Sequence, residues 1–128
     1  MDVLLSGDEP GATALESALR ELGLDADRFD QPLALAEMMV ALENVLECEV
    51  PRLALGVGAG DASLALVITA AKLGVPVAAC LDDDVGVQAD EHRIVATLAS
   101  FTAGPAGDAS RAAGRVVSWL ETKRLAET

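Results

Sequence analysis

The stretch Arg52-Leu53-Ala54-Leu55-Gly56-Val57-Gly58-Ala59-Gly60-Asp61 decides the fold of this chain. Its apolar start predicts a buried strand over residues 52–55. Three glycines at alternate positions follow, and the next apolar stretch, Asp61–Lys72, predicts a helix that ends near Gly74. A strand, a glycine loop and a helix together form the arrangement that cradles phosphate groups, because glycine permits close approach and a helix start offers unpaired N–H groups. Glycine turns of this kind also occur for conformational reasons alone.

The rest of the chain repeats this alternation of strands and helices. Strands are predicted over residues 3–5, 52–55, 76–81 and 94–101, with a short edge strand over residues 25–29. Helices are predicted over residues 13–22, 32–47, 61–72 and 109–125, with a short one leading to Glu91, and Asp108 suits a helix cap. Strands that alternate with helices imply a parallel sheet covered on both faces. We therefore expect one doubly wound, Rossmann-like α/β domain over residues 1–128, with a five-stranded parallel sheet.

Composition and charge exclude several classes of function. The chain has 128 residues, of which 52% are hydrophobic, and a net charge of −12. Without a basic face or a set of aromatic side chains, nucleic acid is not an expected partner. No apolar run approaches the roughly 18 residues that span a membrane, and Met1-Asp2-Val3 lacks the basic start of a signal peptide. We expect a cytoplasmic protein without a membrane segment.

Metal and disulfide chemistry are also not expected. Cys48 and Cys80 lack a metal-ligand spacing, and each is interpreted as a small core residue rather than half of a disulfide. The run Asp82-Asp83-Asp84 could bind magnesium or calcium, or form a solvated loop. Three consecutive acids seldom converge on one ion, so the solvated loop is favoured. We expect no metal and no cofactor.

Several motifs, in order along the chain, resemble those of the ribose-5-phosphate isomerase B and galactose-6-phosphate isomerase family. The segment Leu5–Gly11 is similar to that family's first-strand loop, and Gly56–Gly60 is similar to its Gly-Thr-Gly-x-Gly loop. The segment Gly74–Cys80 resembles the strand that follows, Glu91-His92 falls on a Glu-His-Asn-Asp motif, and Trp119-Leu120 matches a pair in the last helix. The resemblance to this family extends over most of the chain.

This resemblance implies a homodimer with a shared site that interconverts an aldose phosphate and a ketose phosphate through an enediolate. Asp61 would be the catalytic base and His92 the acid/base that opens the sugar ring. Asp8 would contact substrate hydroxyls. The amides of Gly56, Gly58 and Gly60 would stabilise the enediolate oxygen. Glu9, Arg93, Lys123 and Arg124 stand at or near positions with which the family binds its substrate.

Two other functions remain open. Leu55 stands where one branch of the family has a cysteine base, and Glu9 replaces a histidine, which favours a relative that has lost the reaction. Such a protein would bind a small molecule or another subunit. Alternatively, residues 60–78 are loosely similar to sugar-nucleotide epimerases, which suggests a nucleotide-sugar-binding domain.

The proposed site residues also have plain structural interpretations. Asp61 could be a helix N-cap, and His92 a surface or helix-end histidine. Asp8 and Glu9 could form a coupled carboxylate pair or simply a solvated loop. Lys123 and Arg124 could complement the negative end of their helix.

Overall fold

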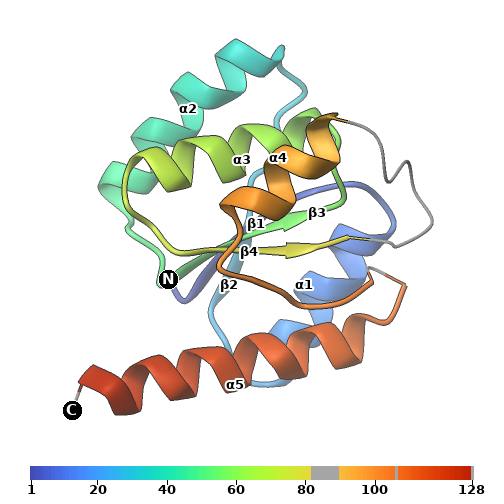
Figure 1. The fold of residues 1–128 in the computed structure, drawn as a ribbon, viewed down its shortest axis with the longest axis vertical. Helices are drawn as coiled ribbons and strands as arrows, with labels where there is room; N and C mark the ends of the chain where they lie inside the picture. The colour runs from blue at the N-terminus through green and yellow to red at the C-terminus, as the bar shows by residue number, and fades with distance from the viewer. Residues whose placement is uncertain (82–89, 106, 128) are drawn as a thin grey trace.

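The computed structural model describes residues 1–81, 90–105 and 107–127, which form a parallel sheet covered by helices on both faces (Figure 1). The strands are β1 (Val3–Gly7), β2 (Ala26–Arg28), β3 (Leu53–Val57), β4 (Val77–Cys80) and β5 (Phe101–Thr102). The helices are α1 (Gly11–Glu21), α2 (Leu35–Cys48), α3 (Asp61–Lys72), α4 (Asp90–Leu98) and α5 (Ala109–Glu127). The predicted doubly wound α/β class with a five-stranded parallel sheet is confirmed.

The strands lie in the order β2-β1-β3-β4-β5, and each neighbouring pair is parallel. β1 and β3 are neighbours along five residues, from Val3 opposite Leu53 to Gly7 opposite Val57. All five residues of β3 are buried, as are the first four of β1. Their continuous apolar runs reflect the helices on both faces of the sheet.

Two hydrophobic clusters lie on the two faces of the sheet. α1 and α5 cover one face, where Leu15 and Val116 are fully buried. α2, α3 and α4 cover the other face, where Leu42, Leu66 and Val95 are fully buried (Figure 1). α3 packs against the sheet and also against α2 and α4, so it buries residues on most of its circumference. This central position holds the start of α3 firmly beside the glycine loop.

The prediction of a strand over residues 94–101 is wrong. α4 continues to Leu98, and only Phe101–Thr102 pair with β4. Short apolar runs do not distinguish a strand from a buried helix by periodicity. Here Val95 is fully buried while Ile94 and Leu98 are more than a third exposed, which is the one-sided burial of a surface helix. A parallel crossover from β4 to β5 also requires such a connection.

The helix ends agree with the predictions in part. Asp108 caps α5, since its Oδ1 accepts a hydrogen bond from the Arg111 N–H at 3.3 Å. Asp61 is not the cap of α3, because Gly60 occupies the N-cap position and Asp61 is the first helical residue. The second helix starts at Leu35 rather than at Pro32.

Cys80 is buried in the core, as predicted, whereas Cys48 is exposed on α2. Neither forms a disulfide within the described residues. None of the helices in the described part of the chain is both long and apolar enough to span a membrane.

Candidate functional site

The candidate site lies at the carboxyl ends of β1 and β3. From β1 the chain passes to β2 on one side, and β3 lies on the other side, so the order of strands reverses between β1 and β3. Ligands of open α/β sheets bind in the crevice at such a switch point. Asp8 directly follows β1, and the glycine loop Gly58–Gly60 directly follows β3. The topology therefore brings together two of the motifs that the sequence singles out.

The glycines of the loop have different structural roles. Gly56 lies within β3, and a Cβ there would stand 2.5 Å from Ser63 Oγ, so this glycine permits close packing of α3 on the sheet. Gly58 has a φ of +77° and donates its N–H to the Cys80 carbonyl at 2.8 Å. That N–H is therefore engaged between the ends of β3 and β4. Gly60 is the N-cap of α3.

The carboxylate of Asp8 lies directly on the glycine loop. A Cβ at Gly58 would stand 2.2 Å from Asp8 Oδ2, and a Cβ at Gly60 would stand 2.7 Å from Asp8 Oδ1. The backbone of Asp8 is fixed as well, since its N–H donates to the Val57 carbonyl at 2.9 Å. Glycine at positions 58 and 60 thus permits the Asp8 carboxylate to lie where it does.

A cleft of about 360 Å³ opens beside Asp8. It is lined by Asp8, Glu9, Pro10, Gly11, Ala14, Val57, Gly58 and Gly107. Two carboxylates and no cation are among these side chains. The size is at the lower end of the range of small-molecule sites, about 300–1,000 Å³.

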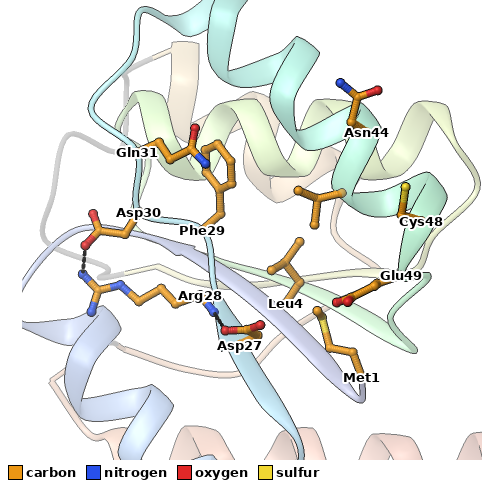
Figure 2. A pocket seen from close by; sticks show the side chains of 11 residues that line it. Met1, Leu4, Asp27, Arg28, Phe29, Asp30, Gln31, Asn44, Cys48 and Glu49 are labelled. Atoms are coloured by element: carbon orange, nitrogen blue, oxygen red, sulfur yellow. Dashed lines mark hydrogen bonds and ion pairs between the residues drawn. The ribbon is translucent and has the colours of Figure 1, made fainter.

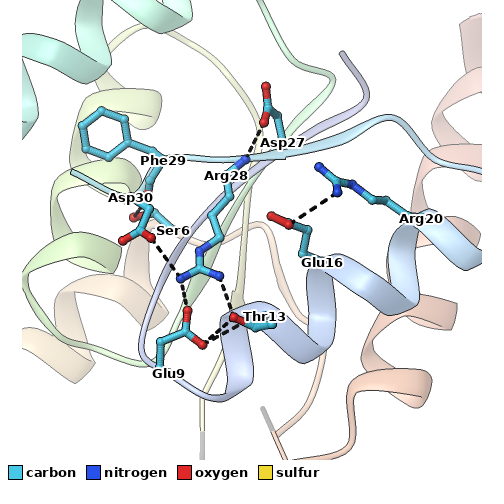
Figure 3. A network of polar contacts seen from close by, with 9 residues as sticks. All are labelled: Ser6, Glu9, Thr13, Glu16, Arg20, Asp27, Arg28, Phe29 and Asp30. Carbon is cyan, nitrogen blue, oxygen red and sulfur yellow. Dashed lines mark hydrogen bonds and ion pairs between the residues drawn. The ribbon is translucent and has the colours of Figure 1, made fainter.

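Glu9 belongs to a polar network at the rim of this cleft (Figure 3). The Arg28 guanidinium pairs with Glu9 and lies 3.5 Å from Asp30, while it also donates to Thr13 Oγ1 at 2.6 Å. Thr13 in turn donates to Glu9 at 2.7 Å. The sequence did not indicate Arg28 as a site residue, since there it counted only toward the net charge. The available signal was its position in the strand predicted over residues 25–29, just before the end of that strand.

Asp61 is exposed at the start of α3, and no hydrogen bond or ion pair of its side chain occurs within the described residues. His92 lies in the first turn of α4. Arg93 is exposed on the same helix and lies 3.8 Å from Asp90. Asp61 is therefore open to a ligand at the edge of the sheet that carries the cleft.

Lys123 and Arg124 lie away from the glycine loop. Lys123 lines a small cavity with Arg52 and Pro76, which stand at the amino ends of β3 and β4. Its ammonium group is 5.5 Å from the centre of the Trp119 ring, which stacks on Phe101. Within one chain, these cations do not join the site around Asp8.

A larger groove, of about 620 Å³, lies between β2 and α2 (Figure 2). Leu4, Phe29 and Val45 give it an apolar lining, and Asp27 and Glu49 add acidic groups. It shares no residue with the glycine loop, so we place the candidate site at the smaller cleft. No cluster of three potential metal ligands occurs among the described residues, and Asp82–Asp84 lie outside them.

The fold and the cleft define a doubly wound α/β domain with a switch-point site. No family model matches the chain, and no curated protein matches it. Solved structures share its fold. UDP-GlcNAc 2-epimerase from Methanocaldococcus jannaschii superposes with a TM-score of 0.62 at 17% identity, over 89% of this chain and 41% of that chain. The Neisseria meningitidis UDP-GlcNAc 2-epimerase bound to UDP-GlcNAc gives 0.59 at 18% identity, over 88% and 42%.

A Staphylococcus aureus MnaA–UDP structure gives a TM-score of 0.60 at 18% identity, over 80% of this chain and 37% of that chain. The chain thus spans about two fifths of the length of the epimerases that it resembles. The resemblance to the ribose-5-phosphate isomerase B family is wrong, because the structures that share this fold are UDP-GlcNAc 2-epimerases. The loose similarity of residues 60–78 to sugar-nucleotide epimerases agrees with them.

Ser63 connects the glycine loop to α3, and its loss is expected to weaken the fold. Its fully buried Oγ donates a hydrogen bond to the Gly58 carbonyl at 2.8 Å. We expect Ser63→Ala to lower the free energy of unfolding by about 1 kcal/mol, as measured by urea denaturation. Thr69→Val is the control, because the buried Thr69 hydroxyl has no partner in the described residues. Equal losses in both variants would contradict a role for the Ser63 bond.

Proposed function

We propose that the chain is a sugar-recognition domain that binds a hydroxyl-rich, sugar-derived ligand in the cleft beside Asp8. The observation that carries this proposal is the meeting of Asp8 and the glycine loop at the switch point between β1 and β3. A carboxylate is a strong acceptor for hydrogen bonds from sugar hydroxyls. The solved structures of this fold add support, since one is bound to UDP-GlcNAc and another to UDP.

The domain proposed for this role is the whole chain, residues 1–128. Both hydrophobic clusters include residues from its first and second halves, since Leu15 and Val116 belong to one cluster and Leu42 and Val95 to the other. Truncation at either end would therefore expose core side chains. The homodimer with a shared site remains a prediction, and sedimentation of the natural protein at micromolar concentration tests it.

A titration followed by backbone NMR tests the sugar site. We expect N-acetylglucosamine to shift the amide signals of Asp8, Gly11 and Gly58 in a saturable manner. Ala14→Leu places a larger side chain at the wall of the cleft, from an exposed position on α1. This variant is expected to lose the shifts while it keeps the melting temperature.

Ala36→Leu is the matched control, because it adds the same atoms at an exposed position of α2, on the opposite face of the sheet. It is expected to bind as the natural protein does. Binding that survives Ala14→Leu unchanged would place the ligand elsewhere. An absence of saturable shifts with any free sugar would contradict the proposed function.

A second candidate function is proton transfer at a sugar carbon, as isomerases and epimerases perform. The exposed carboxylate of Asp61 favours it, because a general base must reach its substrate. Asp61 is the proposed base and His92 the proposed acid/base, with Gly60 near the developing charge. Incubation with UDP-GlcNAc and with ribose 5-phosphate, followed by product analysis, tests this function. Turnover that is unchanged in Asp61→Asn would remove Asp61 from the mechanism.

A further inference from the structure

The contact between Asp8 and the glycine loop is so close that a side chain at Gly58 or Gly60 would displace the Asp8 carboxylate. Cβ atoms in proteins essentially never approach another heavy atom within 3.0 Å, yet a Cβ at Gly58 or Gly60 would stand 2.2 or 2.7 Å from the Asp8 carboxylate. The two carboxylate oxygens are spread over the two ends of the loop, with Oδ2 toward Gly58 and Oδ1 toward Gly60. The carboxylate therefore lies against the part of the backbone that a ligand would otherwise approach.

This is the position at which α/β domains bind phosphate. Gly60 is the N-cap of α3 and, as a glycine, has no side chain with which to cap the helix. The first N–H groups of a helix and its macrodipole favour an anion there. In this protein the Asp8 carboxylate, which follows the end of β1, lies at this position.

The charged side chains around Asp8 also disfavour the binding of a phosphate group. Glu9 follows Asp8 in the wall of the cleft, and no lysine or arginine is among the described residues that line it. The nearest cation of the polar network, Arg28, is paired with Glu9 and lies close to Asp30. The Arg28 side chain is also largely covered, with 18% of it exposed. A phosphate group entering the cleft would therefore meet the Asp8 carboxylate at the glycine loop, beside a Glu9 carboxylate that is paired with Arg28.

We propose that Asp8 excludes phosphate groups from the glycine loop, so that the ligand of the cleft is an uncharged sugar rather than a sugar phosphate or a sugar nucleotide. The location of the ligand rests on the proposed function. The exclusion itself depends only on the placement of the Asp8 carboxylate. This exclusion distinguishes the glycine loop of this chain from the phosphate-binding glycine loops that its sequence resembles.

Variants of Asp8 test the exclusion with UDP as the probe, in calorimetric titrations at low salt. We expect no saturable binding of UDP by the natural protein at millimolar concentration. Asp8→Ala removes both the charge and the volume of the side chain over the loop. It is expected to bind UDP at least about tenfold more tightly than the natural protein, because the repulsion between the carboxylate and a nearby phosphate is lost. Asp8→Asn keeps the shape without the charge and is expected to gain less.

Asp27→Ala is the control, because it removes the same charge from an exposed position of β2 that does not contact the loop. It should not gain UDP binding. Near-ultraviolet circular dichroism of Trp119 reports whether each variant is folded, and Asp8→Asn decides the matter if Asp8→Ala does not fold. Tight UDP binding by the natural protein, or no gain in a folded Asp8 variant, would overturn the exclusion. The titration with free sugar tests the proposed function separately, because it uses the natural protein and an uncharged probe.

Discussion

Gly7→Ala is expected to lower the stability of the fold strongly. Gly7 ends β1 with a φ of +151°, and a Cβ there would stand 2.0 Å from the carbonyl oxygen of Val57. That oxygen accepts the hydrogen bond from the Asp8 N–H, so its movement would disturb the junction of β1 and β3. The clash and the backbone strain together are expected to cost about 3 kcal/mol or more.

Urea denaturation measures this loss, and Gly23→Ala provides the control. Gly23 also has a positive φ, +87°, but a Cβ there would meet no atom within 4 Å. Its substitution is expected to cost about 1 kcal/mol, from backbone strain alone. If the two variants were equally stable, collision with Val57 would not be the reason for glycine at position 7.

Leu55→Ala is expected to lower the free energy of unfolding by about 2–5 kcal/mol, because it leaves a cavity in the centre of the sheet. Leu55 is fully buried in the cluster beneath α1 and α5, and it lies opposite Leu5 in the adjacent strand. Thermal and urea denaturation measure the loss. A fall in stability this large approaches the whole stability of a small domain, about 5–15 kcal/mol.

Leu125→Ala is the matched control, since Leu125 is 75% exposed on α5. Its effect is expected to remain within about 0.5 kcal/mol. A loss below 1 kcal/mol for Leu55→Ala would mean that the interior closes around the missing atoms.

The strands and helices were predictable where the pattern of apolar residues fits only one kind of secondary structure. The apolar run before the glycine loop predicts β3, and the long apolar stretch from Asp61 to Lys72 predicts α3 within the observed bounds. The region of α4 was not predictable in this way, because Ile94-Val95 has high strand propensity and the helical burial of Val95 depends on α3. The packing of this segment against α3, rather than its local sequence, therefore determines that it is helical.

The candidate site was predictable only in its backbone. Asp8 and the glycine loop follow from the rule that strand ends gather polar residues, whereas the pairing of Glu9 with Arg28 joins residues 19 positions apart. The wrong family resemblance has the same cause. Glycine loops and strand-end acids recur in many α/β proteins because of their geometry, so their order alone does not identify a chemistry.

The short edge strands have a consequence for behaviour in concentrated solution. β2 has three residues and β5 has two, and both lie at the ends of the sheet. An unpaired strand edge recruits other chains when it is long, flat and apolar. β2 instead presents the charged Asp27 and Arg28, and the net charge of −12 keeps molecules apart. The architecture thus resists edge-to-edge aggregation although 52% of its residues are hydrophobic.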